Sequence, residues 1–221
     1  MLRYLAAAML ALLPLAAQAQ TEQQTLVDRS TLVVQEMLSD NNASEARNLM
    51  KKAKGVMVCP RIFKAGFFVG GEGGGCVLVG HNANGGWSAP AFYSMASGSF
   101  GLQIGVQDAE MILIVLTDKG LQALLDSQFK FGADASVAVA SIGAGVAGAT
   151  TAALRADIVS FAQARGLFAG ISLEGSLLSN KSDWDGAYYG QPMGAQQIVI
   201  GMQGQNAGAE PLKEMLGRFA Q

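Results

Sequence analysis

The sequence has few of the residues that carry most enzymatic and metal chemistry. Of its 221 residues, two are cysteine and one is histidine, and only 14% are charged. Soluble domains usually carry about 25% charged residues. A histidine metal site or a Ser-His catalytic pair would depend entirely on His81, and no Gly-x-Ser-x-Gly motif supplies a nucleophile. We therefore expect a protein without enzymatic activity, bound metal or cofactor.

An excess of positive charge is also missing. The 15 basic residues are outnumbered by 17 acidic ones, which gives a formal net charge of −2. A nucleic-acid-binding domain usually carries a clear basic excess, so we expect no nucleic-acid partner. Disorder is excluded as well, because 50% of the residues are hydrophobic.

The apolar run near the N-terminus is too short to cross a membrane. It covers residues 5–17, whereas a spanning helix needs roughly 20 apolar residues. Arg3 precedes this run and Ala17-Gln18-Ala19 ends it, which is the three-part pattern of a cleavable secretory signal peptide. We predict that residues 1–19 are removed and that residues 20–221 form one periplasmic or secreted domain. No cysteine lies near the cleavage point, so we expect no lipoprotein tether.

Glycine, in contrast, is abundant, with 28 residues. Residues 25–38 have apolar side chains at helical spacing. Asn42 and Glu45 have capping-box spacing at the start of a second helix that Gly55 closes. From Gly55 onward, short β-branched and aromatic runs alternate with glycine and predict strands, at residues 56–59, 66–69, 76–79, 87–93, 102–106, 111–116, 136–141, 158–163 and 167–178.

Three more helical segments are predicted, at residues 118–125, 180–189 and 211–220. The run 111–116 is continuously apolar, so it should be a central strand covered on both faces. We therefore expect an α+β domain: a glycine-rich, mostly antiparallel or barrel-like sheet, with helices at the N-terminus and one at the C-terminus.

Several motifs allow a plain structural interpretation. Gly70–75 is interpreted as a hairpin turn or bulge, and Gly143–148 as a Gly/Ala-rich loop, because neither has the context of a nucleotide-binding motif. Asp183 and Asp185 are interpreted as helix caps and not as calcium ligands. Cys59 and Cys76 are either a disulfide, which export permits, or two buried thiols in neighbouring strands.

One basic segment stands out on this weakly acidic chain. Between Glu45 and Lys64 there are six basic residues and one acidic residue, and Phe63, Phe67 and Phe68 lie beside them. Cations next to exposed aromatic side chains suit an anionic membrane surface. The alternative is an ordinary solvated helix face. The candidate lipid-binding residues are Lys51, Lys52, Lys54, Arg61 and Lys64.

Four motifs in order make residues 52–189 resemble the SYLF domain family. They are Ala53-Lys54-Gly55-Val56, Lys64-Ala65-Gly66-Phe67, Trp87-Ser88-Ala89-Pro90 and the run from Gly166 to Ser176. The resemblance implies a non-enzymatic module that binds acidic phospholipids. It also implies that an N-terminal amphipathic helix, here within residues 25–54, contacts the membrane.

Export would change the partners that this resemblance implies. An exported chain would meet neither phosphoinositides nor the actin that some yeast members bind. We therefore expect a peripheral membrane module of the bacterial envelope, which meets acidic lipids such as phosphatidylglycerol or cardiolipin. Two alternatives remain: a structural or protein-interaction module with an envelope partner, and an enzyme with an unfamiliar site around Asp183 and Asp185.

Overall fold

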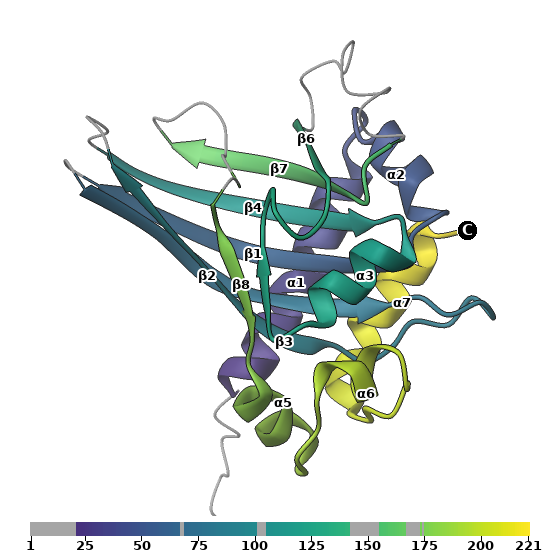
Figure 1. Ribbon diagram of the computed structural model, residues 1–221. Coiled ribbons are helices and arrows are strands. Elements are labelled where there is room, and N and C mark those ends of the chain that lie inside the picture. Colours follow the sequence, from purple (N-terminus) through teal and green to yellow (C-terminus); the bar gives the residue numbers. More distant parts are fainter. Residues whose placement is uncertain (1–20, 67–68, 101–104, 142–154, 167–172, 174) are drawn as a thin grey trace, which may run out of the picture.

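The protein is described by a computed structural model that covers residues 21–66, 69–100, 105–141, 155–166, 173 and 175–221. The predicted signal peptide and the Gly143–148 loop lie outside these residues, so both remain predictions. Eight strands form one sheet in the order β5-β8-β3-β2-β1-β4-β7-β6 (Figure 1). Their bounds are β1 Gly55–Gly66, β2 Val69–Gly80, β3 Ala91–Phe100, β4 Gly105–Val115, β5 Gln128–Lys130, β6 Val137–Ser141, β7 Ile158–Gly166 and β8 Leu177–Asn180.

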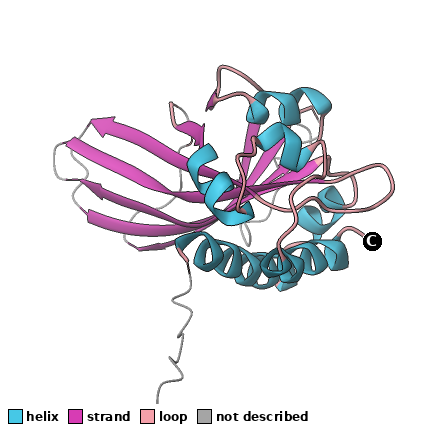
Figure 2. Ribbon diagram, turned by 90° about the horizontal axis from the view of Figure 1, so that it is seen from below, coloured by secondary structure: helices cyan, strands magenta, loops and turns pink. Residues whose placement is uncertain are grey.

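Helices cover both faces of this curled sheet. Two of them, α1 and α7, pack side by side under one face (Figure 2), whereas α3 and α6 contact strands from the other. The described helices are α1 Glu22–Ser39, α2 Ser44–Met50, α3 Asp118–Leu125, α5 Ser182–Tyr189, α6 Ala195–Val199 and α7 Glu210–Phe219, with a 3₁₀ turn η1 at Ala207–Ala209. All described strand neighbours are antiparallel except β6 and β7. The predicted α+β class and mostly antiparallel sheet are confirmed.

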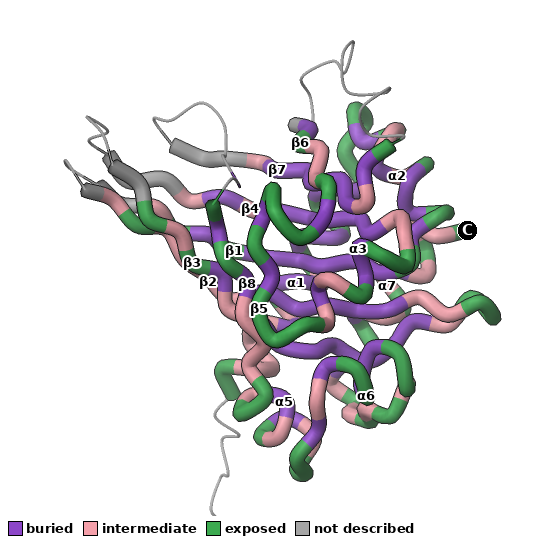
Figure 3. Tube along the Cα trace, in the orientation of Figure 1, coloured by how far each residue is buried: buried purple, intermediate pink, exposed green. Residues whose placement is uncertain are grey.

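The core is double because side chains alternate across the central strands. On β4, Ile112 and Ile114 join the core under α1 and α7, whereas Met111 and Leu113 join the core on the other face. All four are fully buried, as expected for the continuous apolar run. Buried positions concentrate where helices cover the sheet (Figure 3), and β1, β2 and β4 extend past the helices at one end.

A proline interrupts the central strand β1. Pro60 has no N–H to donate to a neighbouring strand, so a proline inside a sheet is normally found at a bulge. The registers of β1 with β2 and with β4 both shift around this position. Immediately before it, Cys59 is disulfide-bonded to Cys76 of β2, with a Cα–Cα distance of 4.2 Å. The structure therefore decides the open question of the cysteine pair in favour of the disulfide.

Three local predictions were wrong. Gly70–75 lies inside β2 and is not a turn, because residues on both sides continue the same antiparallel pairing with β3. Asn42 does not cap the second helix, which begins at Ser44 without a side-chain cap. Asp185 is not a helix cap either: it is fully buried, and its carboxylate accepts hydrogen bonds from Phe92 N at 2.8 Å and Asn180 Nδ2 at 3.1 Å.

The parallel edge strand β6 is fastened to β7 by one carboxylate. Asp157 precedes β7 and accepts hydrogen bonds from Thr117 Oγ1 at 2.7 Å, Ser136 Oγ at 2.8 Å and Ser136 N at 3.0 Å. The Thr117 hydroxyl contributes most to lowering the pKa of Asp157 well below its usual range, followed by the groups of Ser136. The charged form of this side chain therefore stabilises the fold.

Replacing Asp157 by Asn should destabilise the protein at neutral pH by about 2 kcal/mol, because hydrogen bonds to a charged group contribute about 1.5–3 kcal/mol. A depressed folded pKa gives stability that is present above the unfolded value of 3.8 and lost as pH falls below it. Urea unfolding at several pH values should show the difference between wild type and Asp157→Asn shrinking below about pH 4. A difference that stays constant with pH would contradict this assignment.

Candidate functional site

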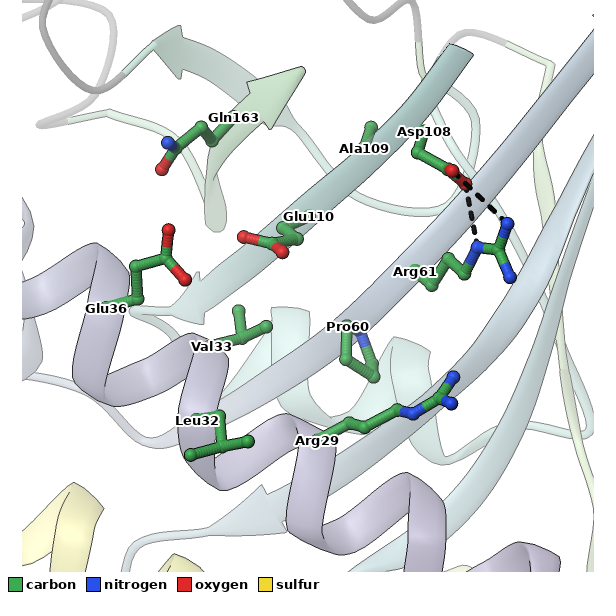
Figure 4. A pocket seen from close by; sticks show the side chains of 10 residues that line it. All are labelled: Arg29, Leu32, Val33, Glu36, Pro60, Arg61, Asp108, Ala109, Glu110 and Gln163. Atoms are coloured by element: carbon green, nitrogen blue, oxygen red, sulfur yellow. Dashed lines mark hydrogen bonds and ion pairs between the residues drawn. The ribbon is translucent and has the colours of Figure 1, made fainter. Parts of the chain in front are cut away.

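A groove runs between α1 and the part of the sheet formed by β1, β2 and β4. It consists of two cavities of about 420 and 360 Å³, which share Arg29, Pro60 and Arg61; Figure 4 shows the first of them. We call this the amphiphilic groove. The other residues that line it are Glu22, Thr25, Leu26, Leu32, Val33, Glu36, Gly74, Gly75, Asp108, Ala109, Glu110, Gln163 and Trp184.

Helix α1 presents one side to the core and another to the groove. Val33, Val34 and Met37 are buried against the sheet, so the predicted apolar stripe packs on the domain. Leu32 lies on the side turned away from the core and is 63% exposed. An exposed leucine beside a cavity can give apolar area to a bound amphiphile, which the buried stripe cannot.

The glycines of β2 make the floor of the groove. A Cβ atom on Gly75 would lie 3.0 Å from the side chain of Leu26, and one on Gly74 would collide with the carbonyl of Arg61. Only glycine lets α1 and the bulge of β1 approach this strand so closely. The glycine-rich run, interpreted from the sequence as a turn, thus shapes the candidate site.

Charge is divided along the groove. The guanidinium of Arg61 donates to both carboxylate oxygens of Asp108, at 2.8 and 3.2 Å, which raises the pKa of Arg61 and lowers that of Asp108. Arg29 makes no ion pair with any acid among the described residues. In Figure 4 the two guanidinium groups lie toward one end of the groove, and the side chains of Glu36 and Gln163 lie toward the other.

An exposed aromatic ring extends this surface beyond the groove. Phe63 is 41% exposed, and the guanidinium of Arg61 lies 5.6 Å from the centre of its ring. Arg61 and Phe63 are two residues apart on β1 and therefore share a face of the sheet. Arg61 thus lines the groove together with the exposed Leu32 and lies against the exposed ring of Phe63.

The five basic residues predicted from the sequence do not form one cluster. Lys51 and Lys52 are exposed just after α2, where β1 begins, and Lys54 pairs with Asp118 at 3.3 Å. Arg61 lies six residues further along β1 than Gly55, which at about 3.3 Å per residue is roughly 20 Å away.

Lys64 faces away from Arg61. The two are three residues apart on β1 and therefore lie on opposite faces of the sheet. Its ammonium is 3.9 Å from Glu72, which is opposite it on β2. Burial raises the pKa of Glu72, and Lys64 partly opposes this shift. Lys64 thus belongs to the other surface of the sheet.

Sequence reasoning missed Arg29 and Leu32. The sequence does contain a signal for Leu32, because it is an apolar residue on the polar side of a helix whose apolar stripe is otherwise complete. The sequence gives no such signal that Arg61, Asp108 and Gln163 line the same groove, since they come from three separate strands.

Other kinds of site find no support in the described part of the chain. No group of three or more metal-ligating side chains occurs among the described residues. Both carboxylate oxygens of Asp185 accept hydrogen bonds inside the fold, so it offers no reactive group at the surface. None of the described helices is long and apolar enough to cross a bilayer.

Comparison with known proteins now gives the family. Residues 96–219 match the family described as "Ysc84: Las17-binding protein actin regulator", which is more than half of the chain. The chain belongs to the Ysc84 family. The resemblance to SYLF domains is thereby confirmed.

Curated relatives of this Ysc84-family chain occur in animals and yeast. It is 33% identical to the SH3 domain-containing YSC84-like protein 1 of Rattus norvegicus, over 79% of this chain and 51% of the relative. Identity to the protein of the same name in Homo sapiens is 31%, with the same coverage. The LAS seventeen-binding protein 3 of Saccharomyces cerevisiae is 28% identical, over 76% of this chain and 37% of the relative. The chain thus spans about half the length of the animal relatives and less of the yeast protein.

Proposed function

We propose that this Ysc84-family domain is a non-enzymatic module that binds membranes containing acidic phospholipids. The observation that carries the proposal is that two exposed apolar side chains lie near Arg61: Leu32 lines the amphiphilic groove with Arg61 and Arg29, and the ring of Phe63 lies against the guanidinium of Arg61. Interfacial binding needs apolar area together with electrostatic attraction to anionic lipids. Leu32 and Phe63 give the apolar area, and Arg29 with the exposed Lys51 and Lys52 gives the attraction, against four acidic residues that also line the groove, Glu22, Glu36, Asp108 and Glu110.

The five basic residues predicted from the sequence have unequal roles in this proposal. Arg61 contacts headgroups beside the apolar side chains, and the exposed Lys51 and Lys52 add attraction at a second point. Lys54 and Lys64 contribute less: each lies beside a carboxylate, as Arg61 does beside Asp108, but neither lines the amphiphilic groove. Arg29 joins the set as a headgroup contact within the groove.

The proposed location is the bacterial envelope, after removal of residues 1–19. The buried disulfide between Cys59 and Cys76 supports an exported protein, because disulfides persist mainly in oxidising compartments. In that location the available acidic lipids would be phosphatidylglycerol and cardiolipin, and neither phosphoinositides nor actin would be partners.

Co-sedimentation with vesicles tests the proposal. The chain from Gln20 onward should pellet with vesicles that contain phosphatidylglycerol and stay in solution with pure phosphatidylcholine, and added salt should weaken the binding. Replacing Leu32 and Phe63 together by Ser should weaken binding about 30-fold, because each partly exposed side chain can contribute about 1 kcal/mol of apolar burial. The matched control is Val139→Ser, which also replaces an exposed apolar side chain by serine but lies on the edge strand β6; it should leave vesicle binding unchanged.

A charge variant completes this experiment. Lys51→Gln with Lys52→Gln should also weaken binding by about 30-fold, since each basic residue near an anionic surface contributes about 1 kcal/mol. Lys130→Gln, on the short edge strand β5, should change nothing. Equal pelleting with neutral and acidic vesicles would refute the proposal, and so would full binding by both double variants.

A protein-interaction role is the second candidate function. It is favoured by the family description, which names its members as Las17-binding actin regulators. In this chain the partner would be a protein of the envelope, bound without any preference for acidic lipid. This candidate would be favoured over the first if the chain bound no vesicles but bound one purified envelope protein with an affinity that salt does not change.

A further inference from the structure

The link between α1 and α2 carries a sequence motif that the amphiphilic groove does not use. Residues 40–44 are Asp40-Asn41-Asn42-Ala43-Ser44, and none of them lines the groove. Asn42-Ala43-Ser44 matches Asn-x-Ser/Thr, the acceptor sequence for N-linked glycans in exported proteins. Asn42 does not cap α2, so helix capping does not explain its presence.

The side chains of this motif are open to solvent. Asp40, Asn42 and Ser44 are all exposed, and only Ala43 is buried. Neither the carboxamide of Asn42 nor the hydroxyl of Ser44 makes a hydrogen bond with any residue that the structure describes. A carboxamide nitrogen carries two donor hydrogens, so Asn42 Nδ2 keeps both of them for a partner outside the chain.

The turn that carries Asn42 is held by its backbone. Asp40 Oδ1 accepts from Asn42 N at 2.7 Å, and the carbonyl oxygen of Asp40 accepts from Ala43 N at 3.0 Å. Arg47 Nη1 donates to the carbonyl oxygens of Leu38 and Asp40, both at 2.8 Å. These bonds fix the chain between the two helices without using the side chain of Asn42.

A second Asn-x-Ser/Thr sequence in the same chain gives a comparison. In Asn180-Lys181-Ser182 the asparagine is committed to the fold, because its Nδ2 donates to the carbonyl oxygen of Phe92 and to Asp185 Oδ2, both at 3.1 Å. The serines are equivalent: Ser44 and Ser182 are both exposed, and each is the first residue of a helix. The two sequences therefore differ in the availability of the amide nitrogen.

This difference matters for the chemistry of glycan transfer. The lone pair of an amide nitrogen is delocalised toward its carbonyl, as in a peptide bond, so the nitrogen is a weak nucleophile. An oligosaccharyltransferase has to weaken that conjugation through contacts to the amide group itself. Asn42 permits such contacts, whereas Asn180 would first have to give up both hydrogen bonds inside the fold.

We propose that Asn42 is an acceptor for N-linked glycosylation and that the transferase recognises the carboxylate of Asp40. The co-substrate is an oligosaccharide carried on a polyprenyl diphosphate. Asn42 Nδ2 attacks C1 of its first sugar, the bond from C1 to the diphosphate oxygen breaks, and the polyprenyl diphosphate leaves with the electron pair. One amide proton passes to a base of the enzyme. Bacterial transferases of this class select an acidic residue two positions before the asparagine, where Asn42 has Asp40 and Asn180 has Leu178.

This proposal rests on the export proposed above but not on lipid binding. Asn-linked transfer takes place on exported chains, which is also where disulfides persist. The bond between Cys59 and Cys76 supports the same location. A failure of vesicle binding would therefore leave the glycosylation site standing, and a failure of glycosylation would leave the membrane proposal standing.

Production in a glycosylating host tests the site. The full chain is made in bacteria whose periplasm contains an oligosaccharyltransferase and a polyprenyl-diphosphate oligosaccharide of known mass. The intact mass of the exported protein should rise by one glycan, and fragmentation of its peptides should place that glycan on Asn42. If residues 1–19 do not direct export, a signal peptide of the host in front of Gln20 takes their place. An exported chain without a glycan, or with one on Asn180 instead, would overturn the proposal.

Matched serine variants locate the modification. Ser44→Ala should lower the glycosylated fraction by a factor of about ten or more, because a site built to bind a hydroxyl rejects the analogue without it. Ser182→Ala, the same change at the first residue of α5, should leave the fraction unchanged. Equal glycosylation of the two variants would place the glycan elsewhere and refute the site.

Two variants of Asp40 test its part in recognition. Asp40→Asn keeps an oxygen that can accept from Asn42 N but removes the charge, and it should lower the glycosylated fraction by a factor of about ten or more, because hydrogen bonds to a charged group are the stronger ones. Asp40→Glu restores the charge and should restore most of the glycosylation. Unchanged glycosylation of Asp40→Asn would contradict recognition of the carboxylate.

Discussion

Removing the disulfide between Cys59 and Cys76 should lower the free energy of unfolding by about 3 kcal/mol. The bond closes a loop with a sequence separation of 17 residues, and the loss of chain entropy in the unfolded state predicts about this value for such a loop. For a domain of this size the melting temperature should fall by roughly 6–12 °C. Thermal unfolding with and without dithiothreitol, with thiol titration to confirm reduction, measures the effect.

The double replacement of Cys59 and Cys76 by Ala is the control for this experiment. It should melt close to the reduced wild type, and the reductant should not shift its melting temperature further. An unchanged melting temperature in wild type whose thiols have been shown to be reduced would contradict the prediction. The bond also flanks the bulge that carries Pro60 and Arg61. If the membrane proposal holds, reduction should therefore weaken vesicle binding as well.

Replacing Asp185 by Ala should destabilise the protein by about 3 kcal/mol. The fully buried carboxylate joins α5 to the sheet by accepting from Phe92 N on β3 and Asn180 Nδ2 on β8. Alanine would leave Phe92 N buried without an acceptor and would remove one of the two acceptors of Asn180 Nδ2, which keeps the carbonyl oxygen of Phe92; each such loss costs about 1–3 kcal/mol. Asp185→Asn keeps one acceptor and should lose only about 1 kcal/mol. Equilibrium unfolding in urea at pH 7 distinguishes the two variants.

The pH dependence of these variants gives an independent check. Burial is the largest cause that raises the pKa of Asp185 to about 6, and the hydrogen bonds from Phe92 and Asn180 oppose it. A raised folded pKa means that the contribution of this group to stability is complete below the unfolded value and lost as pH rises through about 6. The wild type should therefore gain stability relative to Asp185→Asn as pH falls from 7 to 4, opposite in sign to Asp157→Asn. A gap between the curves that is independent of pH would contradict the assignment.

Much of the secondary structure was predictable because its causes are local. The apolar spacing of residues 25–38 predicted a helix, and the structure has α1 there. The continuous apolar run at 111–116 predicted a strand covered on both faces, as β4 is. The turn predicted at Gly70–75 was wrong because a glycine run is equally compatible with a turn and with a strand that other chain segments approach closely. Gly74 and Gly75 lie in such a strand, where α1 and β1 approach β2.

The candidate site was predictable only in part. Six basic residues within twenty positions suggested one cluster, but an extended strand separates neighbours in sequence and turns alternate side chains to opposite faces. Arg61 therefore lies in the candidate site, whereas Lys64 lies on the other face of the sheet. Arg29 was not predicted, because its role depends on a strand that begins more than twenty residues later.

The sequence by itself determined the α+β class, the positions of the main helices and strands, and the resemblance to the SYLF family. These properties follow from periodicity and from short motifs, which act over a few residues. Only the tertiary structure decided that Cys59 and Cys76 are bonded and that Leu32 and Arg61 line one groove. Each of these depends on strand register and on how α1 and α7 pack, and that packing is set by contacts between segments distant in the chain.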